Sequence, residues 1–525
     1  MTFNFRNPWF LPVLSGFFIG TSYIPFPPWA LLFGFIPLWI FWAQQTRLKP
    51  VILSGVLATF VFTLIGFNWV TYLLHEFAHL PWIGAAGGMV LFALIAHLFV
   101  PLSGLLWFLG RQCGLYQERS SILVMGLLTA LLLWLLPMLF KWNLGYSWYG
   151  AELPLYHVAE YIGFSGLSML TILANVPLYF AWQQRSNKRG KALLMRVVIV
   201  FSLLNVWGLN TKAWLQIPDS SFNVLLIQAN IGNAQKVAAQ FGRGGYADII
   251  HQYQMLTKAG LNEYKDQNVD FVLWSETAFP SVLSTKNSEN NNYYAQKLIK
   301  SVHASKVPLI TGSYAKQAST GRITNSLFVL DAQGAVQPNY YSKSTLLALG
   351  EYIPWEDKFP ILRELMPMVG DFGHGNGPNE LLHLNDYKIG AQICYESLFP
   401  EFSKSLADLG AQFIVNVTND SWYGTWQEPY QHKVMTLARA VEIRRPLIRA
   451  TNTGISTVVL ASGEVLEESP MKKQWYGLYK VPYMQEPKPT FYQQNFYLMP
   501  TALATILALL LLMGIKNTAI INLRK

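Results

Sequence analysis

Apolar runs long enough to cross a membrane fill most of the first 211 residues of this chain and recur near its end. A helix needs roughly 20 mainly apolar residues to cross the ~30 Å hydrocarbon core of a bilayer. The sequence predicts such helices over residues 9–25, 28–44, 51–74, 84–110, 122–140, 161–182, 193–211 and 494–515. We therefore expect a polytopic α-helical membrane protein with eight transmembrane helices.

The stretch between the seventh and eighth runs has the composition of a soluble domain. Hydrophobic residues make up 52% of the chain and charged residues 13%, but the apolar excess is concentrated in the predicted spans. This contrast predicts a seven-helix transmembrane domain over residues 1–212 and a linker over 213–221. A folded domain over 222–485 and a C-terminal transmembrane helix with its tail over 486–525 complete the prediction.

Lysine and arginine are distributed unevenly among the segments that join the predicted helices. One set of alternate segments carries Arg6, Arg47, Lys49, Arg111, Arg119, Arg185, Lys188, Arg189, Lys191, Lys516, Arg524 and Lys525. The short loops on the other side offer only Lys141. Because basic segments stay in the cytoplasm, both termini are predicted to be cytoplasmic and residues 213–493 to lie outside. In a bacterial inner (plasma) membrane, the outside is the periplasm.

The basic excess has a second possible explanation, which is nucleic-acid binding. The formal net charge is +10, yet no basic stripe interleaved with aromatic residues appears, as such binding would require. Topology accounts for the charge, so no nucleic-acid partner is expected. The same topology places Cys113 and Cys394 on opposite sides of the membrane, which excludes a disulfide between them. The first run contains Pro12 and leads at once into the second, so we expect a retained signal anchor.

The outer segment alternates strand-like and helix-like patterns. Short β-like runs are predicted over residues 222–229, 271–274, 309–314, 326–330, 389–394 and 413–418. Helical patterns lie between them, near residues 245–266, 291–304, 396–409 and 428–444. Strands that alternate with helices are typical of a layered α/β domain.

Three polar residues follow predicted strands, where α/β proteins place their sites. Glu276 comes directly after the strand ending at Trp274, Lys343 lies in Tyr341-Ser342-Lys343, and Cys394 ends the strand that begins at Ile389. A thiol, a carboxylate and an ammonium together can perform nucleophilic catalysis. Read one by one, a cysteine at a strand end is usually core filler, and the glutamate and lysine could form a structural ion pair.

Glu276, Lys343 and Cys394, in this order and in these contexts, resemble the Glu-Lys-Cys triad of the nitrilase superfamily. The resemblance covers about residues 222–485 and implies a four-layer α-β-β-α sandwich. With eight membrane helices added, the whole chain resembles the apolipoprotein N-acyltransferase family. The resemblance implies that Glu276 is the general base, Lys343 the residue that stabilises the oxyanion, and Cys394 the nucleophile.

The same resemblance assigns supporting roles to other positions. It implies that Glu351 supports the triad, that Tyr395 and Glu396 match the residues after the nucleophile, and that Asn325 matches a site asparagine. Trp422, with Tyr423 and Trp426, falls where the pattern places the pocket rim; acyl-chain contact and a packed aromatic cluster are both open readings. Some family members carry tryptophan where this chain has Val237, which leaves the role of that position in doubt.

The resemblance also implies the substrates. The acyl donor is a membrane glycerophospholipid, the acceptor is the α-amine of an S-diacylglyceryl-cysteine apolipoprotein, and a thioester on Cys394 links the two half-reactions; no cofactor is implied. The apolar segment 365–373, punctuated by glycine and proline, is interpreted either as a lid that dips into the lipid surface or as a buried loop.

One motif points to a different chemistry. His75-Glu76-Phe77-Ala78-His79 fits the H-E-x-x-H pattern of zinc proteases. Pro81 ends that helix almost at once, and no later segment supplies a third ligand in a matching context, so no metal is predicted. Two rival functions remain: a membrane-tethered amidase would share the triad but need fewer spans, and a transporter would need more charges inside the membrane.

Overall fold

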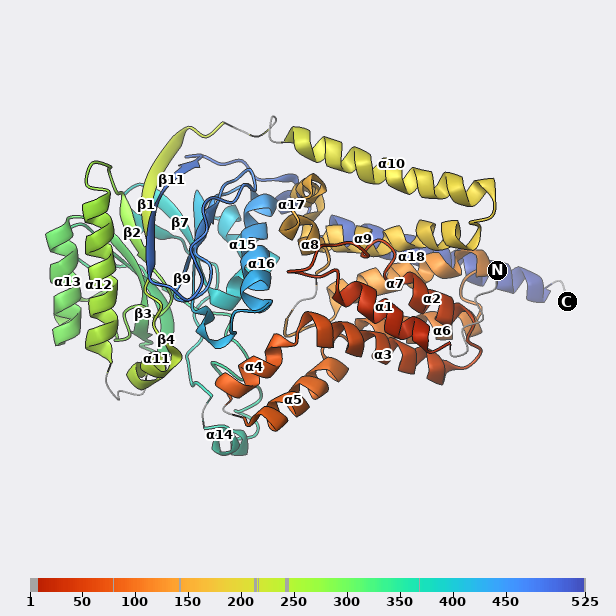
Figure 1. Ribbon diagram of the computed structural model, residues 1–525, viewed down its shortest axis with the longest axis horizontal. Helices are drawn as coiled ribbons and strands as arrows, with labels where there is room; N and C mark the ends of the chain where they lie inside the picture. The colour runs from red at the N-terminus through yellow and green to blue at the C-terminus, as the bar shows by residue number, and fades with distance from the viewer. Residues whose placement is uncertain are drawn as a thin grey trace. The chain divides into compact units, whose positions relative to one another are not determined.

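The chain folds into two compact units, and this computed structural model describes residues 8–78, 80–140, 143–211, 215, 217–240, 245–367 and 369–523 (Figure 1). The first unit comprises residues 1–214 and 494–525 and is helical. The second comprises residues 215–493 and contains both β-sheets.

The first unit consists of helices that follow the predicted apolar runs. They are α1 (Phe10–Gly20), α2 (Ile36–Ala43), α3 (Leu48–Gly66), α4 (Trp69–Glu76), α5 (Trp82–Ile95), α6 (Phe99–Gln112), α7 (Ser121–Leu135), α8 (Gly145–Gly150), α9 (Ala159–Gln183), α10 (Lys188–Thr211) and α18 (Leu498–Leu523). Two short 3₁₀ turns, η1 (Glu118–Ser120) and η2 (Pro154–Val158), precede α7 and α9.

Six helical stretches in the described residues are long and apolar enough to cross a membrane. They are Leu48–Gly66, Trp82–Gln112, Glu118–Leu135, Pro154–Gln183, Lys188–Thr211 and Leu498–Lys516. The first two predicted runs form the shorter α1 and α2, of 11 and 8 residues. Pro25, Pro27 and Pro28 lie between these two helices, and proline interrupts helices because it lacks an N–H donor.

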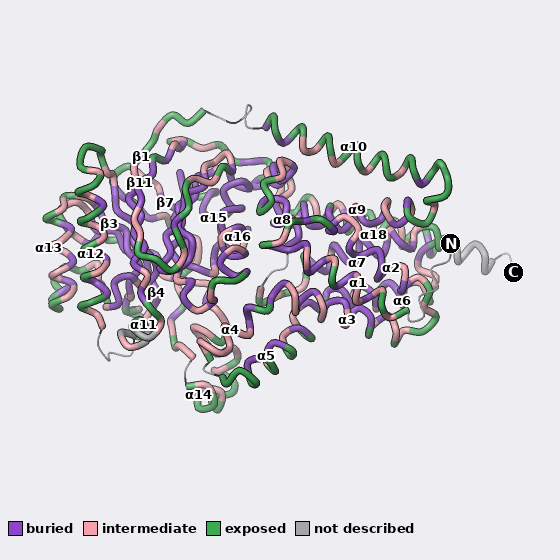
Figure 2. Tube along the Cα trace, viewed as in Figure 1, coloured by how far each residue is buried: buried purple, intermediate pink, exposed green. Residues whose placement is uncertain are grey.

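Small residues bring the first helices of this unit close together. A Cβ on Gly16 of α1 would lie 2.5 Å from the carbonyl oxygen of Ala58 in α3, so only glycine fits there. Such close backbone approach is typical of helix pairs in membranes. By contrast, α10 is apolar yet exposed along most of its length (Figure 2), with Leu203 61% exposed. Its surface suits contact with lipid.

The second unit contains two mixed sheets. The first has the order β11-β1-β2-β3-β4-β5 and the second β10-β9-β8-β7-β6. Their strands are β1 (Ser220–Gln228), β2 (Phe271–Trp274), β3 (Leu309–Lys316), β4 (Ile323–Leu330), β5 (Tyr341–Ser342), β6 (Leu382–Leu384), β7 (Tyr387–Ile393), β8 (Phe413–Thr418), β9 (Leu447–Thr451), β10 (Thr457–Val459) and β11 (Trp475–Tyr483). The central strands β1, β2 and β3 run parallel, as do β7, β8 and β9.

Helices cover the outer face of each sheet, which gives four layers (Figure 1). Helix α12 (Tyr246–Glu263) packs on the first sheet beside α13 (Tyr293–Ser305), while α15 (Pro400–Asp408) and α16 (Glu428–Ile443) pack on the second. Shorter helical segments are α11 (Asn233–Gln240), η4 (Asn287–Glu289), α14 (Ile361–Leu365), η5 (Cys394–Leu398), η6 (Asp420–Trp422) and α17 (Phe491–Gln494). This is the α-β-β-α sandwich that the resemblance implies.

Aromatic side chains join the two sheets. The rings of Phe222 on β1 and Phe413 on β8 lie 4.4 Å apart between centroids, and Phe271 on β2 lies 6.2 Å from Phe413. Figure 2 shows the strands of both sheets largely buried. Since the two sheets pack face to face, residues that follow strands of different sheets can meet.

The helix predicted over residues 396–409 differs from the structure. Cys394 opens η5, a five-residue 3₁₀ turn, and α15 begins only at Pro400. Proline is favoured in the first turn of a helix, where its missing N–H is not needed, so Pro400 marks a new start. The expected α-helix directly after the cysteine is therefore a short 3₁₀ turn, and the α-helix starts only at Pro400.

Candidate active site

Cys394 follows β7 in a strained conformation. Its φ is 52°, in the left-handed region that residues other than glycine rarely adopt. The Ser397 hydroxyl donates to the Cys394 carbonyl at 3.0 Å and the Asn416 side chain does so at 3.5 Å, which holds the turn. Burial and the charge of Glu276 raise the pKa of the thiol, and the Lys343 ammonium only partly offsets them. The resting group is thus a neutral thiol that needs a base.

Glu276 lies just after β2, on a turn that packs tightly against β3. The next residue, Thr277, has a φ of 48°. A Cβ on Gly312 would lie 2.5 Å from the Thr277 nitrogen, so glycine is required for the turn to fit. The Asn325 side-chain amide donates to Glu276 Oε1 at 2.7 Å. The carboxylate is therefore held at a defined place between the sheets.

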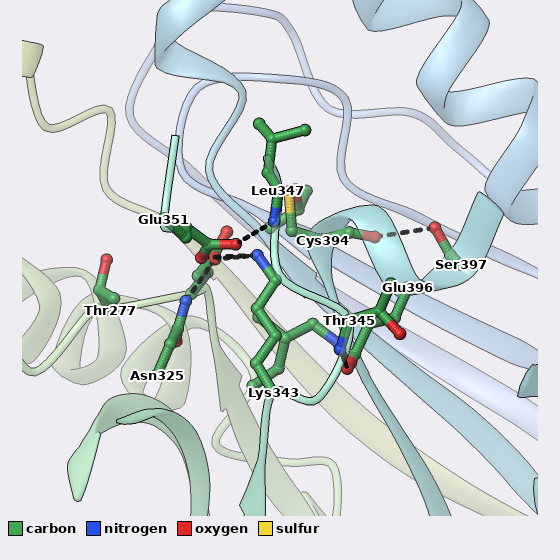
Figure 3. A network of polar contacts seen from close by, with 12 residues as sticks. Thr277, Asn325, Lys343, Thr345, Leu347, Glu351, Cys394, Glu396 and Ser397 are labelled. Carbon is green, nitrogen blue, oxygen red and sulfur yellow. Dashed lines mark hydrogen bonds and ion pairs between the residues drawn. The ribbon is translucent and has the colours of Figure 1, made fainter. Parts of the chain in front are cut away.

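Lys343 follows β5 and is 2% exposed. Its Nζ lies 2.8 Å from Glu351 Oε1 (Figure 3). It lies 3.5 Å from Glu276 Oε1. Burial lowers the pKa of the ammonium, but the two carboxylates outweigh it and the net shift is upward. The Lys343 backbone N–H also donates to the Asn325 carbonyl at 2.8 Å, which brings these two residues side by side. Lys343 is thus a fixed buried cation.

Glu396 links the Lys343 loop to the strand that ends before Cys394. Its Oε1 accepts hydrogen bonds from Tyr341 Oη at 2.5 Å, Ser344 N at 2.7 Å and Thr345 N at 3.1 Å. Its Oε2 accepts one from Ile393 N at 2.9 Å, directly before the cysteine. Glu396 is fully buried. Glu351 closes the same loop from the other side, since its Oε2 accepts a hydrogen bond from the Leu347 N–H at 2.8 Å.

The remaining predicted residues lie near this centre with less defined roles. Tyr395 packs edge-on against Phe399, with ring centroids 5.1 Å apart. Trp422 is half-buried at the end of η6, and the neighbouring Tyr423 is buried. Burial, then the charge of Cys394, raises the pKa of the Tyr423 hydroxyl, which indicates that this aromatic segment lies near Cys394. The Val237 side chain lies outside the described residues.

Sequence analysis did not identify two features of the site. Lys236 on α11 is buried, and its Nζ donates to the Glu276 carbonyl at 2.9 Å. Asp420 accepts hydrogen bonds from Arg449 Nη2 at 2.8 Å and His432 Nδ1 at 3.0 Å. Lysine in a polar helical segment is ordinarily exposed, so nothing in the local pattern marked Lys236. The Asp420 set joins a strand end, a helix and a second strand, which only the fold brings together.

Asp420, Glu428 and His432 form a possible metal-binding group, with ligand atoms within 4.8 Å of one another. The Arg449 guanidinium already forms an ion pair with Asp420, however. The Arg449 guanidinium holds the pKa of Asp420 below its usual range against the effect of burial, while burial lowers the pKa of His432 and raises that of Glu428 well above its usual range. Because Asp420 is already engaged by Arg449 at 2.8 Å and by His432 at 3.0 Å, we interpret the cluster as structural.

The H-E-x-x-H motif is described only in part. His75 Nδ1 bonds to the Leu80 carbonyl at 2.8 Å, and its ring stacks on Trp82 at 3.9 Å between centroids. His79 lies outside the described residues. His75 is therefore already engaged in local contacts, and the prediction that the motif binds no metal stays a prediction.

Comparison with known proteins identifies both parts of the chain. The family model described as "Carbon-nitrogen hydrolase" matches residues 216–476, and that described as "Apolipoprotein N-acyltransferase N-terminal domain" matches residues 15–176. An apolipoprotein N-acyltransferase of Bdellovibrio bacteriovorus is 39% identical over 493 residues, covering 92% of this chain and 89% of that protein. One from Geobacter metallireducens is 29% identical, covering 89% and 88%.

Among solved structures, the chain is similar to an amidase from Nesterenkonia sp., at 17% identity and a TM-score of 0.35, over 54% of this chain and 94% of that one. The resemblance noted in the sequence is confirmed by the sequence relatives, since the Bdellovibrio protein matches along most of both chains. This chain belongs to the apolipoprotein N-acyltransferase family.

Proposed function

We propose that the enzyme moves a fatty acyl chain from a glycerophospholipid, through a thioester on Cys394, to the α-amine of an S-diacylglyceryl-cysteine apolipoprotein. Family membership supports acyl transfer to a lipoprotein amine. The observation that carries the proposal is the contact of the Lys343 ammonium with Glu276 at 3.5 Å in a buried site with Cys394. A thiol, a base and a cation are the three groups that thioester chemistry requires.

In the first half-reaction, Glu276 takes the thiol proton as Cys394 Sγ attacks the ester carbonyl carbon. The C=O π electrons move to oxygen, and the Lys343 ammonium stabilises this oxyanion with the Tyr395 N–H. Collapse of the intermediate breaks the C–O bond to glycerol. Glu276 gives its proton to the departing alkoxide, which leaves as lysophospholipid, and the thioester remains.

In the second half-reaction, the lipoprotein amine attacks the thioester carbonyl. Glu276 accepts a proton from the amine, and the C–S bond breaks as the tetrahedral intermediate collapses. The thiolate takes the proton from Glu276, which restores the neutral thiol that burial favours. The product is an amide, and both substrates use one site in turn.

Eight membrane crossings with both termini in the cytoplasm are part of this proposal, as is a periplasmic catalytic domain. The short helices α1 and α2 do not exclude two crossings. Irregular backbone is tolerated at membrane depth where protein surrounds it, and Tyr23, Ile24 and Leu31, between the two helices, are each at most 3% exposed. The distribution of basic residues supports the orientation.

We also propose that an apolar segment beside the site contacts lipid. Trp355 is 72% exposed, Phe359 58% and Leu365 70%. Leu365 begins segment 365–373, for which a lid and a buried loop are the two readings, and Trp355 and Phe359 lie six to ten residues before it. Exposed aromatic and aliphatic residues of this kind mark interaction surfaces. A lipid-facing lid would give a two-chain substrate access while it limits water, which would otherwise hydrolyse the thioester.

Acceptor chemistry distinguishes this function from hydrolysis by a membrane-bound amidase. The purified enzyme, in phospholipid micelles, is given a diacylglyceryl-cysteine peptide with a free α-amine, and products are identified by mass. We expect a triacylated peptide and an equal amount of lysophospholipid. The same peptide with an acetylated amine should remain unchanged, because its nitrogen is no longer nucleophilic. Free fatty acid in place of triacylated peptide would refute the proposal.

A further inference from the structure

We infer that Lys236 is a positioning residue for this reaction: its ammonium fixes the Glu276–Thr277 turn so that the Glu276 carboxylate can serve the Cys394 thiol. The inference rests on the proposed thioester mechanism. It adds a second buried lysine to a site in which Lys343 alone was expected.

The contacts of Lys236 are directed at the turn itself. It lies on α11 and is 8% exposed. Its Nζ donates to the Glu276 carbonyl at 2.9 Å and to Thr277 Oγ1 at 3.1 Å. Burying an ammonium group away from water costs free energy unless the group is paired or hydrogen-bonded. One acceptor belongs to Glu276, the proposed base, and the other to its neighbour Thr277. Both hydrogen bonds of the Lys236 ammonium therefore restrain this turn.

The turn needs such a restraint because its conformation is unfavourable. Thr277 is β-branched and has a φ of 48°, a left-handed conformation that such residues rarely adopt. On its other side the turn packs against β3, where Phe279 N donates to the Gly312 carbonyl at 2.9 Å. Strained backbone persists only where its surroundings determine it. Lys236 is the charged part of those surroundings.

Charge balance supports the same role. Glu276 and Glu351 share the single ammonium of Lys343, which leaves one negative charge in excess. Lys236 brings a second positive charge, which interacts with the charge of Glu276. Burial lowers the pKa of Lys236 to about 8, and Glu276 opposes this effect. The group is therefore mainly a cation at neutral pH.

Single-turnover acylation tests the inference. Wild type, Lys236→Met and Lys236→Ala are mixed with phospholipid, and both lysophospholipid and hydroxylamine-sensitive acyl-enzyme are followed with time. The control is Lys258→Met, an exposed lysine on α12. We expect Lys236→Met to acylate about tenfold more slowly or worse, the size of one lost hydrogen bond to a charged group. Lys258→Met should match wild type.

Chemical rescue separates positioning by the ammonium from simple filling of space. Ethylammonium ions should accelerate Lys236→Ala in a saturable way, because they restore the cation, while ethanol at equal concentration should not. Lys236→Met acylating within about twofold of wild type, or Lys236→Ala gaining nothing from ethylammonium, would overturn the inference.

Should both Lys236 variants fail to fold, Thr277→Val gives the answer, because it removes one acceptor and keeps the lysine. Its acylation should be slower by about threefold or more, and an unchanged rate would overturn the inference. A wild-type enzyme that forms no acyl-enzyme would instead refute the proposed function, so the two failures are distinguishable.

Discussion

Replacing Glu396 by glutamine removes one specific link between the nucleophile and the loop that carries Lys343. The side chain is fully buried, and donors surround it on both oxygens. The amide oxygen of glutamine can keep the Oε1 position, where Ser344 and Thr345 donate. Its NH₂ group then faces the Ile393 N–H, which loses its acceptor. The perturbation is thus centred on the residue before Cys394.

The size of the effect follows from that one orphaned donor. Leaving a buried N–H unsatisfied costs about 1–3 kcal/mol. We expect this cost to appear as a higher barrier to acylation, because the turn at Cys394 must shift to give the N–H another partner. At about 1.4 kcal/mol per tenfold in rate, acylation should slow about 5- to 150-fold. Alanine is a harsher change, because the N–H groups of Ile393, Ser344 and Thr345 would all lose an acceptor, a sum of about 3–9 kcal/mol. That approaches the whole stability of a domain, about 5–15 kcal/mol.

Two measurements check this prediction. Single-turnover acylation gives the rate, and amide hydrogen exchange reports whether the Ile393 N–H is less protected in Glu396→Gln than in wild type. Glu401→Gln serves as a control, because Glu401 lies on the exposed side of α15. If Glu396→Gln acylated at the wild-type rate, the idea that Glu396 aligns the two halves of the site would be wrong.

Four further outcomes are expected. Glu276→Gln and Lys343→Met should each abolish turnover without loss of folded protein, which activity and size-exclusion measurements check together. The double variant His75→Ala with His79→Ala should keep substantial activity. If it lost both its activity and bound zinc, the metal-site reading of the motif would be favoured again. Because burial lowers the pKa of Lys236 to about 8, its ammonium is lost as pH rises through that value. Acylation should then decline on the alkaline side, and Lys236→Met should lack this inflection. A reporter active only in the cytoplasm should work when fused to the C-terminus, and activity only in a periplasmic reporter would contradict the eight-span orientation.

The membrane helices show where apolar patterns predict structure well and where they do not. The run predicted over 193–211 became α10 (Lys188–Thr211), because nothing within it interrupts a helix. The run over 84–110 is divided into α5 and α6 around the buried His97, whose Nδ1 lies 2.8 Å from Thr63 Oγ1. Hydropathy cannot show such a break, since the residues on both sides are equally apolar.

Some strands were predicted with their observed bounds and others were not predicted. Strands β2 (Phe271–Trp274) and β8 (Phe413–Thr418) have the predicted bounds, because both are short, mainly apolar runs buried in the parallel part of a sheet. Strand β11 (Trp475–Tyr483) was not predicted. It contains Pro482, which normally argues against a strand, but β11 lies at the edge of its sheet, where a missing donor is tolerated.

At the site, the type and order of Glu276, Lys343 and Cys394 suggested a triad through their resemblance to the nitrilase superfamily. The geometry that joins them was not in the local sequence. Glu396 was expected only as a residue that follows the nucleophile, yet it ties two loops together through hydrogen bonds from Ser344 and Ile393. Such roles depend on which strand ends meet between the sheets, which no short motif encodes.

Cys394 itself offers the most direct test of the account. The purified enzyme is incubated with phospholipid alone, and the masses of the intact protein and of its peptides are then measured by mass spectrometry. The account predicts one acyl group on Cys394, removed by hydroxylamine, with about one lysophospholipid released per active site before the reaction stalls. No such adduct should form on Cys394→Ala. Steady release of free fatty acid without an acceptor, or an acyl group that persists in Cys394→Ala, would contradict the account.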